Sequence, residues 1–447
     1  MLDFFTSIDD FVWGPPLLVL LVGTGIYLTI RLGLLQIIRL PKAFKLIFAE
    51  DKGEGDISSF AALATALAAT IGTGNIVGVA TAIKTGGPGA LFWMWIAAFF
   101  GMATKYAEGL LAIKFRTLDD QGNVSGGPMY YITHGFSGKW QIIAKPLAYF
   151  FAFAGVLVAW LGIGTFSQVN SITSSLQNSF GWSPKIVSVI LALITAAIIF
   201  GGIQSISKVS EKVVPFMAGL YIIAALIVIF ANFNQLLPVL EMVFQSAFTG
   251  KAAVGGFAGA TVMAAMRLGI ARGVFSNESG LGSAPIAAAA AKTEEPVEQG
   301  LISMTGTFID TIIICTLTGL AILVTGQWSG SLEGAPMTQA AFSSIFGTFG
   351  ELALTLSLVL FAFTTVLGWS YYGERCFEFI FKSTKFLSFY RLIFVVMGAL
   401  GGYLTLEVVW KIADIVNGLM ALPNLIALLV LSPIILKESK SYFERHK

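Results

Sequence analysis

A few polar side chains interrupt the long apolar stretches of this chain. Asp310 lies about ten residues into the apolar segment 300–325. A charged and unpaired carboxylate at that depth in a bilayer would be costly. Such a group is suited to bind a cation or to carry a proton, and a structural partner elsewhere in the chain would explain it equally well. The sequence leaves these roles open.

Glycine clusters interrupt two other apolar segments. Residues 71–78 read Ile-Gly-Thr-Gly-Asn-Ile-Val-Gly, and residues 276–282 read Ser-Asn-Glu-Ser-Gly-Leu-Gly. Each glycine weakens a helix by about 1 kcal/mol relative to alanine, and backbone groups freed inside a membrane need partners in the protein or a cavity. A broken helix offers amides to a carboxylate and carbonyls to a cation. Close helix packing through small residues is the alternative interpretation.

Hydroxyl, amide and aromatic side chains in other segments are further candidates. Thr364 and Thr365 are adjacent within segment 348–373, and Trp369 lies one turn beyond Thr365 on the same helix face. Hydroxyls combined with carbonyls suit a sodium ion, but taken alone the pattern favours hydroxyls that bond to carbonyls of the preceding turn and a tryptophan that only packs. Gln168, in segment 146–178, carries an amide that would bond to a substrate or to another helix.

Charged residues near the segment ends suggest ion pairs. Two oppositely charged pairs spaced three residues apart are expected to be structural pairs: Lys105 with Glu108, and Lys411 with Asp414. Arg267 and Arg272 precede the second glycine cluster, where they would pair with Glu278 or border a water-filled vestibule.

The composition identifies the environment that these residues share. Of the 447 residues, 56% are hydrophobic and only 12% are charged, which excludes a soluble, disordered or nucleic-acid-binding protein. The chain is therefore predicted to be an all-α membrane protein with about eleven transmembrane helices. The apolar segments lie at about 15–38, 59–84, 88–114, 146–178, 185–204, 212–231, 252–291, 300–325, 348–373, 387–404 and 407–436.

Basic residues are distributed unevenly between the two sides of these segments. Nineteen of the 27 Lys and Arg residues fall on one side, and only Lys84, Lys185 and Lys251 fall on the other. Because basic loops stay in the cytoplasm, we expect a multi-pass protein of the cell membrane with its N-terminus outside and its C-terminus inside. The loops near 232–250 and 326–347 are long enough for short surface helices.

The two glycine clusters stand five segments apart, so the chain divides into two sets of five segments. Because five is odd, the second set must run with inverted topology, as in transporters built from inverted repeats with broken helices. We expect an extra N-terminal helix with the first cytoplasmic segment at 1–50, a first repeat at 51–240, an inverted repeat at 241–436 and a cytoplasmic tail at 437–447.

Several function classes lack their required parts in the sequence. It contains no Walker A motif, no HExxH motif and no nucleophile–base arrangement, and its only histidines are His134 and His446. Cys315 and Cys376 are far apart and predict neither a disulfide nor a metal site. We therefore expect no enzyme activity, no cofactor, no transition metal and no nucleic-acid partner.

Four stretches of the chain resemble the alanine or glycine:cation symporter family. They are Ala-Thr-Ala-Leu-Ala-Ala-Thr-Ile-Gly-Thr-Gly-Asn-Ile-Val-Gly-Val-Ala (64–80), residues 99–108, Gly-Gly-Pro-Met-Tyr-Tyr (126–131) and, most specifically, residues 272–293. The resemblance covers essentially the whole chain. It implies the five-plus-five inverted-repeat fold of the neurotransmitter:sodium symporters (LeuT-type), preceded by one extra helix. It also implies uptake of alanine or glycine with sodium, and we expect a monomer in the bilayer.

The resemblance also implies roles for individual residues. The substrate site would comprise Thr73, Gly74, Gln168, Phe275, Ser276, Asn277, Thr365 and Trp369. The cation sites would comprise Ala68, Thr70, Ile71, Asn75, Ser276, Asp310, Thr364 and Thr365. In this scheme the amides of Thr73 and Gly74 hold the substrate carboxylate, Phe275 is an aromatic gate, and Trp369 leaves room only for a hydrogen or a methyl group. Gln168 replaces the tyrosine of neurotransmitter-type members.

Two alternatives to a sodium symporter remain. A proton-coupled amino-acid symporter would use Asp310 as its proton carrier. A solute channel would use the glycine breaks to line a continuous pore.

Overall fold

A computed structural model describes residues 2–51, 53–249, 262–403 and 406–446. The elements of its first half are α1 (Leu2–Val12), α2 (Pro15–Arg31), α3 (Leu35–Ile38), α4 (Leu40–Ile47), α5 (Ser59–Thr70), the π-helix η1 (Gly74–Gly78), α6 (Val79–Gly86), α7 (Gly89–Lys114), β1 (Thr117–Leu118), β2 (Val124–Ser125), α8 (Pro128–Gly135), the 3-10 helix η2 (Gly138–Trp140), α9 (Gln141–Leu161), α10 (Phe166–Phe180), α11 (Pro184–Ile199), α12 (Gly202–Ala231) and α13 (Phe233–Thr249).

The second half has the same helical character. Its elements are α14 (Val262–Asn277), α15 (Ala284–Ala288), α16 (Pro296–Thr307), the π-helix η3 (Phe308–Cys315), α17 (Thr316–Val324), the 3-10 helix η4 (Gln327–Ser329), α18 (Gly334–Phe346), α19 (Thr348–Phe381), the 3-10 helix η5 (Thr384–Phe386), α20 (Leu387–Leu400), the 3-10 helix η6 (Gly401–Tyr403), α21 (Leu406–Val430) and α22 (Ser432–Arg445).

Each apolar segment expected from the sequence contains helix. Within the described residues, eight helices are long and apolar enough to cross a membrane, or nine if α5 and α6, bent by 51° at their break, count as one span. The other two expected segments contain α11, which has 16 residues, and the α14–α15 pair. The exact number of membrane crossings stays a prediction.

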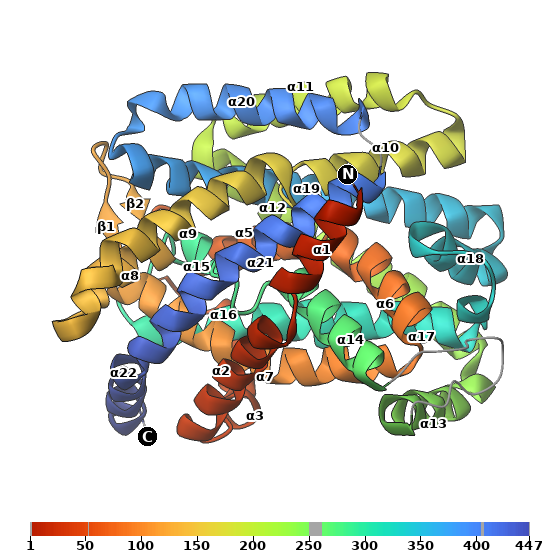
Figure 1. The fold of residues 1–447 in the computed structure, drawn as a ribbon, viewed down its shortest axis with the longest axis horizontal. Coiled ribbons are helices and arrows are strands. Elements are labelled where there is room, and N and C mark those ends of the chain that lie inside the picture. Colours follow the sequence, from red (N-terminus) through yellow and green to blue (C-terminus); the bar gives the residue numbers. More distant parts are fainter. Residues whose placement is uncertain (1, 52, 250–261, 404–405, 447) are drawn as a thin grey trace.

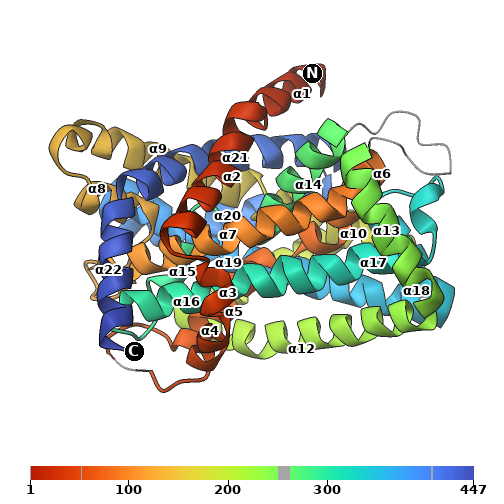
Figure 2. The same ribbon diagram turned by 90° about the horizontal axis from the view of Figure 1, so that it is seen from below.

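The helices form a bundle with two distinct ends (Figures 1 and 2). α13 and α18 lie at one end, here called the α18 end, and they are the surface helices expected in the long loops. α22 and the β1–β2 hairpin lie at the opposite end, called the α22 end, while α11 and α20 run side by side along one edge. α2 packs closely on α7 at Gly25. A side chain would not fit there, since a Cβ on Gly25 would lie 2.8 Å from the carbonyl oxygen of Phe100.

The α22 end joins the start of the first broken helix to the end of the second. Ile57 and Ala291 form a parallel β-bridge just before α5 and just after α15. The Arg116 guanidinium donates hydrogen bonds of 2.7–2.9 Å to four backbone carbonyl oxygens, those of Glu54, Ala289, Ala291 and Thr293. One side chain of the loop after α7 therefore holds both segments together.

The hairpin at the same end depends on Asp119. Burial favours the neutral acid, but hydrogen bonds from the backbone amides of Asn123 and Gln121, the Asn123 side chain and Arg375 lower the pKa of Asp119 below its ordinary value. The Arg375 guanidinium lies 3.1 Å from the carboxylate. A lowered pKa stabilises the folded protein above the pKa of the unfolded chain, and this contribution is lost as the pH falls through the folded value.

We predict that Asp119→Asn lowers the stability of the purified protein by about 2 kcal/mol at pH 7, because hydrogen bonds to a charged group are lost. The difference from wild type should shrink as the pH falls below about 4, because Asp119 takes up a proton in the unfolded chain first and in the folded protein only at lower pH. Thermal unfolding of both proteins from pH 7 to pH 3 tests this. A difference that persists unchanged at pH 3 would contradict it.

Candidate functional site

The first break separates α5 from η1 and is stabilised by two amide-bearing side chains. The backbone N–H of Gly72 donates to Asn75 Oδ1 at 2.9 Å, and the N–H of Thr73 donates to Gln168 Oε1 at 3.3 Å. In a continuous helix these two amides would bond to the carbonyls of Ala68 and Ala69. The break therefore releases those carbonyls for another partner.

Close approach of other helices explains the glycines of this break. A Cβ on Gly72 would lie 2.5 Å from Thr365 Oγ1, and a Cβ on Gly74 would lie 3.0 Å from the Cα of Ser276. The Thr365 hydroxyl donates to the carbonyl of Ile71 at 3.4 Å and to Phe361 of its own helix at 3.0 Å. The first break thus contacts both α19 and the helix that carries the second break.

The second break runs from Glu278 to Ser283, between α14 and α15. Gly280 and Gly282 adopt φ angles of 87° and 83°, and Glu278 adopts 57°, a left-handed conformation that side-chain-bearing residues rarely take. The N–H groups of Gly280 and Gly282 both donate to Oε1 of Glu108, at 3.1 and 3.2 Å. The ammonium of Lys105 donates to the carbonyl of Glu278 at 3.3 Å.

Asn424 of α21 completes this arrangement. Its Nδ2 donates to the carbonyl of Gly280 at 2.9 Å and to Glu108 Oε1 at 2.6 Å, and its Oδ1 accepts from the hydroxyl of Tyr131. Four of the backbone groups exposed by the second break are therefore satisfied by side chains of α7 and α21. This matters because unsatisfied backbone groups are costly inside a membrane.

The two ion pairs predicted from a spacing of three residues do not form in the described structure, so both predictions were wrong. Lys105 and Glu108 form no ion pair with each other and instead bond to the second break. Lys411 pairs with Asp9 at 2.7 Å, whereas Asp414 pairs with Arg272. A spacing of three residues places the two members of each pair on one helix face. Each of the four side chains nevertheless bonds to a group in another part of the chain.

Asp310 lies where the two breaks meet. Its Oδ1 accepts a 2.7 Å hydrogen bond from Asn75, just after the first break, and its Oδ2 accepts a 2.8 Å hydrogen bond from Ser276, just before the second. The hydroxyl of Thr311 adds a 2.7 Å bond to Oδ2. Asp310, Asn75 and Thr311 are each 0% exposed, and Ser276 is 1% exposed. A buried carboxylate surrounded by neutral oxygens and amides suits a hard monovalent cation.

Other candidates from the sequence lie around this cluster. Asn277 donates to the Thr311 hydroxyl at 3.0 Å, and the indole N–H of Trp369 donates to Glu278 Oε1 at 2.9 Å. The guanidinium carbon of Arg272 lies over the ring of Phe275, 5.4 Å from the centroid of the ring. These contacts bring Asn277, Phe275 and Trp369 to the second break.

Two candidate hydroxyls are directed elsewhere. The Thr364 hydroxyl bonds to the carbonyls of Leu360 and Phe361 in its own helix and contacts Met217 Sδ at 3.6 Å. The Thr70 hydroxyl bonds to carbonyls of the preceding turn, in Ala66 and Leu67. The structure therefore brings Thr365, but not the Thr364 hydroxyl, into contact with the first break.

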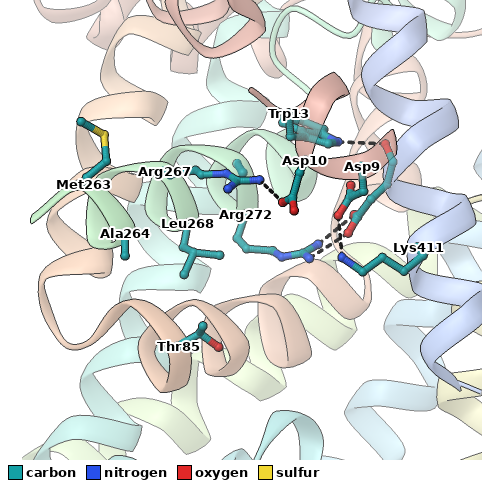
Figure 3. Close-up of a pocket in the computed structure, with 12 residues that line it drawn as sticks. Asp9, Asp10, Trp13, Thr85, Met263, Ala264, Arg267, Leu268, Arg272 and Lys411 are labelled. Carbon is teal, nitrogen blue, oxygen red and sulfur yellow. Dashed lines mark hydrogen bonds and ion pairs between the residues drawn. The ribbon is translucent and has the colours of Figure 1, made fainter. Parts of the chain in front are cut away.

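A vestibule lined in part by charged side chains lies beside this region (Figure 3). A cavity of about 430 Å³ lies between α1, α14 and α21, bordered by Arg267 and Arg272 as the vestibule interpretation expected. Neither arginine is paired with Glu278 there, since Arg267 pairs with Asp10 at 2.5 Å and Arg272 with Asp414 at 2.8 Å. A second cavity, of about 560 Å³, shares Arg272 and Asp414 and is lined by hydroxyls of α10.

Helix dipoles of opposite sign point toward the region around Asp310, between the two breaks. The helix that starts at the first break directs its positive dipole end toward it, and α14 directs its negative end toward it. The described residues contain no group of three or more His, Cys, Asp or Glu that could hold a metal.

Comparison with known proteins identifies the family. The whole chain, residues 1–447, matches the sodium:alanine symporter family. It is 51% identical to the sodium/alanine symporter AgcS of Methanococcus maripaludis over 99% of this chain and 97% of that protein. It is also 54% identical to an uncharacterized transporter of Haemophilus influenzae over 99% of this chain and 96% of that protein. The chain belongs to the sodium:alanine symporter family.

This sodium:alanine symporter family member is thus a multi-pass membrane transporter that couples amino-acid transport to sodium, and it is not an enzyme. Among solved structures it resembles MhsT in complex with L-phenylalanine, with a TM-score of 0.61 and 13% identity over 85% of this chain and 89% of that chain. That likeness confirms the five-plus-five inverted-repeat fold with discontinuous helices.

The sequence did not reveal several residues that shape the site of this symporter. Glu108 and Asn424 bond to the second break across 172 and 144 residues of sequence. Cys315 Sγ lies 3.4 Å from Asn75 Nδ2 and 3.3 Å from Ser276 Oγ, beside Asp310. The five-residue spacing of Asp310 and Cys315 gave no signal, because the π-helical turns of η3 bring both toward the breaks.

We predict that Glu108→Ala lowers the stability of the purified symporter by about 2–4 kcal/mol, because it leaves two buried amides without an acceptor. Glu108→Gln keeps a carbonyl acceptor and should cost less than half as much. Thermal unfolding in detergent measures both, with the exposed Glu241→Ala as a control expected to change stability by less than about 0.5 kcal/mol. Equal losses for the Gln and Ala variants would show that Glu108 does not support the break.

Proposed function

We propose that this symporter takes up alanine and glycine together with sodium by alternating access. The observation that carries the proposal is the contact of both helix breaks with one buried carboxylate, Asp310, through Asn75 at 2.7 Å and Ser276 at 2.8 Å. A cation bound there would draw the two breaks together and so favour the conformation that binds substrate. Coupling requires only that sodium bind this conformation better than the alternatives.

Two cation positions follow from the polar groups of the first break. One would use Asp310, Asn75 and Ser276, where the ion neutralises the buried carboxylate, and it requires Asn75 to turn its Oδ1 from the amide of Gly72 toward the ion. The other would use the carbonyls of Ala68, Thr70 and Ile71 with the hydroxyls of Thr364 and Thr365. Support for the second position comes from the bond between Thr365 and Ile71, and it requires the Thr364 hydroxyl to turn away from its present partners.

The substrate would lie between the opposite dipole ends. Its carboxylate would bond to the amides of Thr73 and Gly74 and to the side chain of Gln168, whose Nε2 is buried without a hydrogen-bond partner among the described residues. Its ammonium would face the carbonyl end of α14 near Ser276 and Asn277.

The gates would lie at the two ends of the bundle. At the α18 end, the Arg272–Asp414 pair and the Phe275 ring would close the path from the vestibule. At the α22 end, the Arg116 bonds and the Ile57–Ala291 bridge would open for release. The excess of basic residues supports a cytoplasmic α22 end and an outward N-terminus, with residues 51–240 and 241–436 as the inverted repeats of a monomer.

Uptake of labelled alanine into proteoliposomes tests this function. At clamped pH and voltage, an inward sodium gradient should drive accumulation. Uptake that is driven by a proton gradient and does not depend on sodium would instead assign Asp310 to proton coupling. The absence of trans-acceleration would indicate a channel.

Asp310→Asn tests the cation position, because asparagine keeps the shape but removes the charge. We expect the sodium concentration for half-maximal uptake to rise at least tenfold, equivalent to about 1.4 kcal/mol of lost binding. Glu241→Gln removes an exposed carboxylate outside the proposed gates and cation sites, and it should leave this sodium dependence within about twofold of wild type. An unchanged sodium dependence in Asp310→Asn would remove Asp310 from the cation site.

The size of the substrate pocket depends on Trp369, which is 0% exposed. We predict that Trp369→Ala raises uptake of valine and leucine relative to alanine, because it removes the largest side chain from the pocket. Trp369→Phe is the control, since it loses the hydrogen bond to Glu278 but keeps most of the bulk. Competition by a series of amino acids measures the change, and an unaltered profile in Trp369→Ala would place Trp369 outside the pocket.

A further inference from the structure

One helix face of α21 connects the vestibule with the second break. Asp414, Asn417, Ala421 and Asn424 follow one another at spacings of three, four and three residues, so they share that face. Asp414 and Ala421 are 5% and 0% exposed, and the two asparagines are each 0% exposed. The first residue of the row bonds to Arg272 of α14 and the last bonds to Gly280 of the second break.

The neighbours of Asn417 confirm the direction of this face. Val416 lies against Gly162 at the end of α9, and Gly418 lies against Trp13 after α1. Leu419 and Leu422, on the opposite side of α21, are 38% and 44% exposed. Asn417 therefore faces the interior of the bundle, between the levels at which α21 bonds to Arg272 and to Gly280.

Asn417 differs from the other polar residues of the row in its bonding. Asp414 and Asn424 have their partners, but neither Nδ2 nor Oδ1 of Asn417 has a hydrogen-bond partner among the described residues. A fully buried carboxamide without partners destabilises a folded protein and calls for an explanation. Thr73 Oγ1 and Gln168 Nε2, at the first break, are also buried without a hydrogen-bond partner among the described residues. The substrate carboxylate is proposed to bind there.

The dipole of α14 indicates which end of the substrate Asn417 would meet. The two ends of the row bond to Arg272 and to Gly280, which lie on either side of the C-terminus of α14 at Asn277, and the negative end of that helix favours a positive group. An ammonium offers N–H donors, for which Asn417 Oδ1 is a free acceptor. A carboxylate would instead be attracted to the amides of the first break.

We propose that Asn417 is a substrate-binding residue whose Oδ1 accepts a hydrogen bond from the α-ammonium of the transported amino acid. The inference rests on the proposed amino-acid function and adds α21 to the elements that contact the substrate. An unpartnered amide of this kind lowers the stability of the substrate-free protein and regains its bond when the amino acid binds.

Asn417→Leu tests the inference, because leucine keeps the branched shape and places two methyl groups where asparagine has its oxygen and nitrogen. We expect an alanine Kd at least tenfold higher than in wild type, together with an equal or higher melting temperature of the substrate-free protein. The sodium-induced shift in melting temperature without alanine should remain unchanged. Asn417→Asp keeps the acceptor oxygen and should bind alanine within about threefold of wild type.

Asn424→Leu is the matched control on the same face. Its amide is fully engaged, so the same substitution should lower the melting temperature. An alanine Kd within twofold of wild type in Asn417→Leu would overturn the inference, as would weakened binding accompanied by a lower melting temperature and a lost sodium shift. Wild-type protein that shows no sodium-dependent alanine binding would contradict the proposed function itself.

Discussion

Backbone amides and carbonyls that leave a helix inside a membrane must be bonded, and side chains from neighbouring helices do this at both breaks of this transporter. Asn75 and Gln168 accept the amides of the first break. At the second, Glu108 accepts two amides, while Lys105 and Asn424 donate to two carbonyls. Asn75 lies in η1, directly after the first break, and the other partners come from α7, α10 and α21. The shape of the two breaks therefore depends on how those three helices pack.

Coupling between cation binding and amino-acid binding depends on the position of Asp310. Asp310 bonds to one residue from each break, so its charge state and any bound cation act on both broken helices together. In the proposed mechanism, a cation that binds better when Asn75 and Ser276 are close would stabilise the same arrangement in which the amides of the first break bind the substrate carboxylate. By linkage, the amino acid must then strengthen cation binding by the same factor. The ion and the substrate need not touch for this to hold.

Much of this architecture could be predicted from the sequence, because it depends on local patterns. Apolar runs gave the helices, and paired glycine clusters gave the breaks and the inverted repeat. The position of Asp310 within an apolar run identified it as unusual, although its bonds to Asn75 and Ser276 span 235 and 34 residues. The ion-pair predictions failed for Lys105, Glu108, Lys411 and Asp414 because helical spacing shows which residues share a face but not which helix lies opposite. The same limit concealed the contributions of Asn424 and Cys315.

The most direct test of the account is reciprocal linkage in the purified protein. The alanine Kd is measured by calorimetry at a series of sodium concentrations, and the sodium Kd at a series of alanine concentrations. The account predicts that each ligand strengthens the other by the same factor, at least about tenfold or 1.4 kcal/mol. An alanine affinity independent of sodium would contradict the claim that a cation at Asp310 assembles the two broken helices around the substrate.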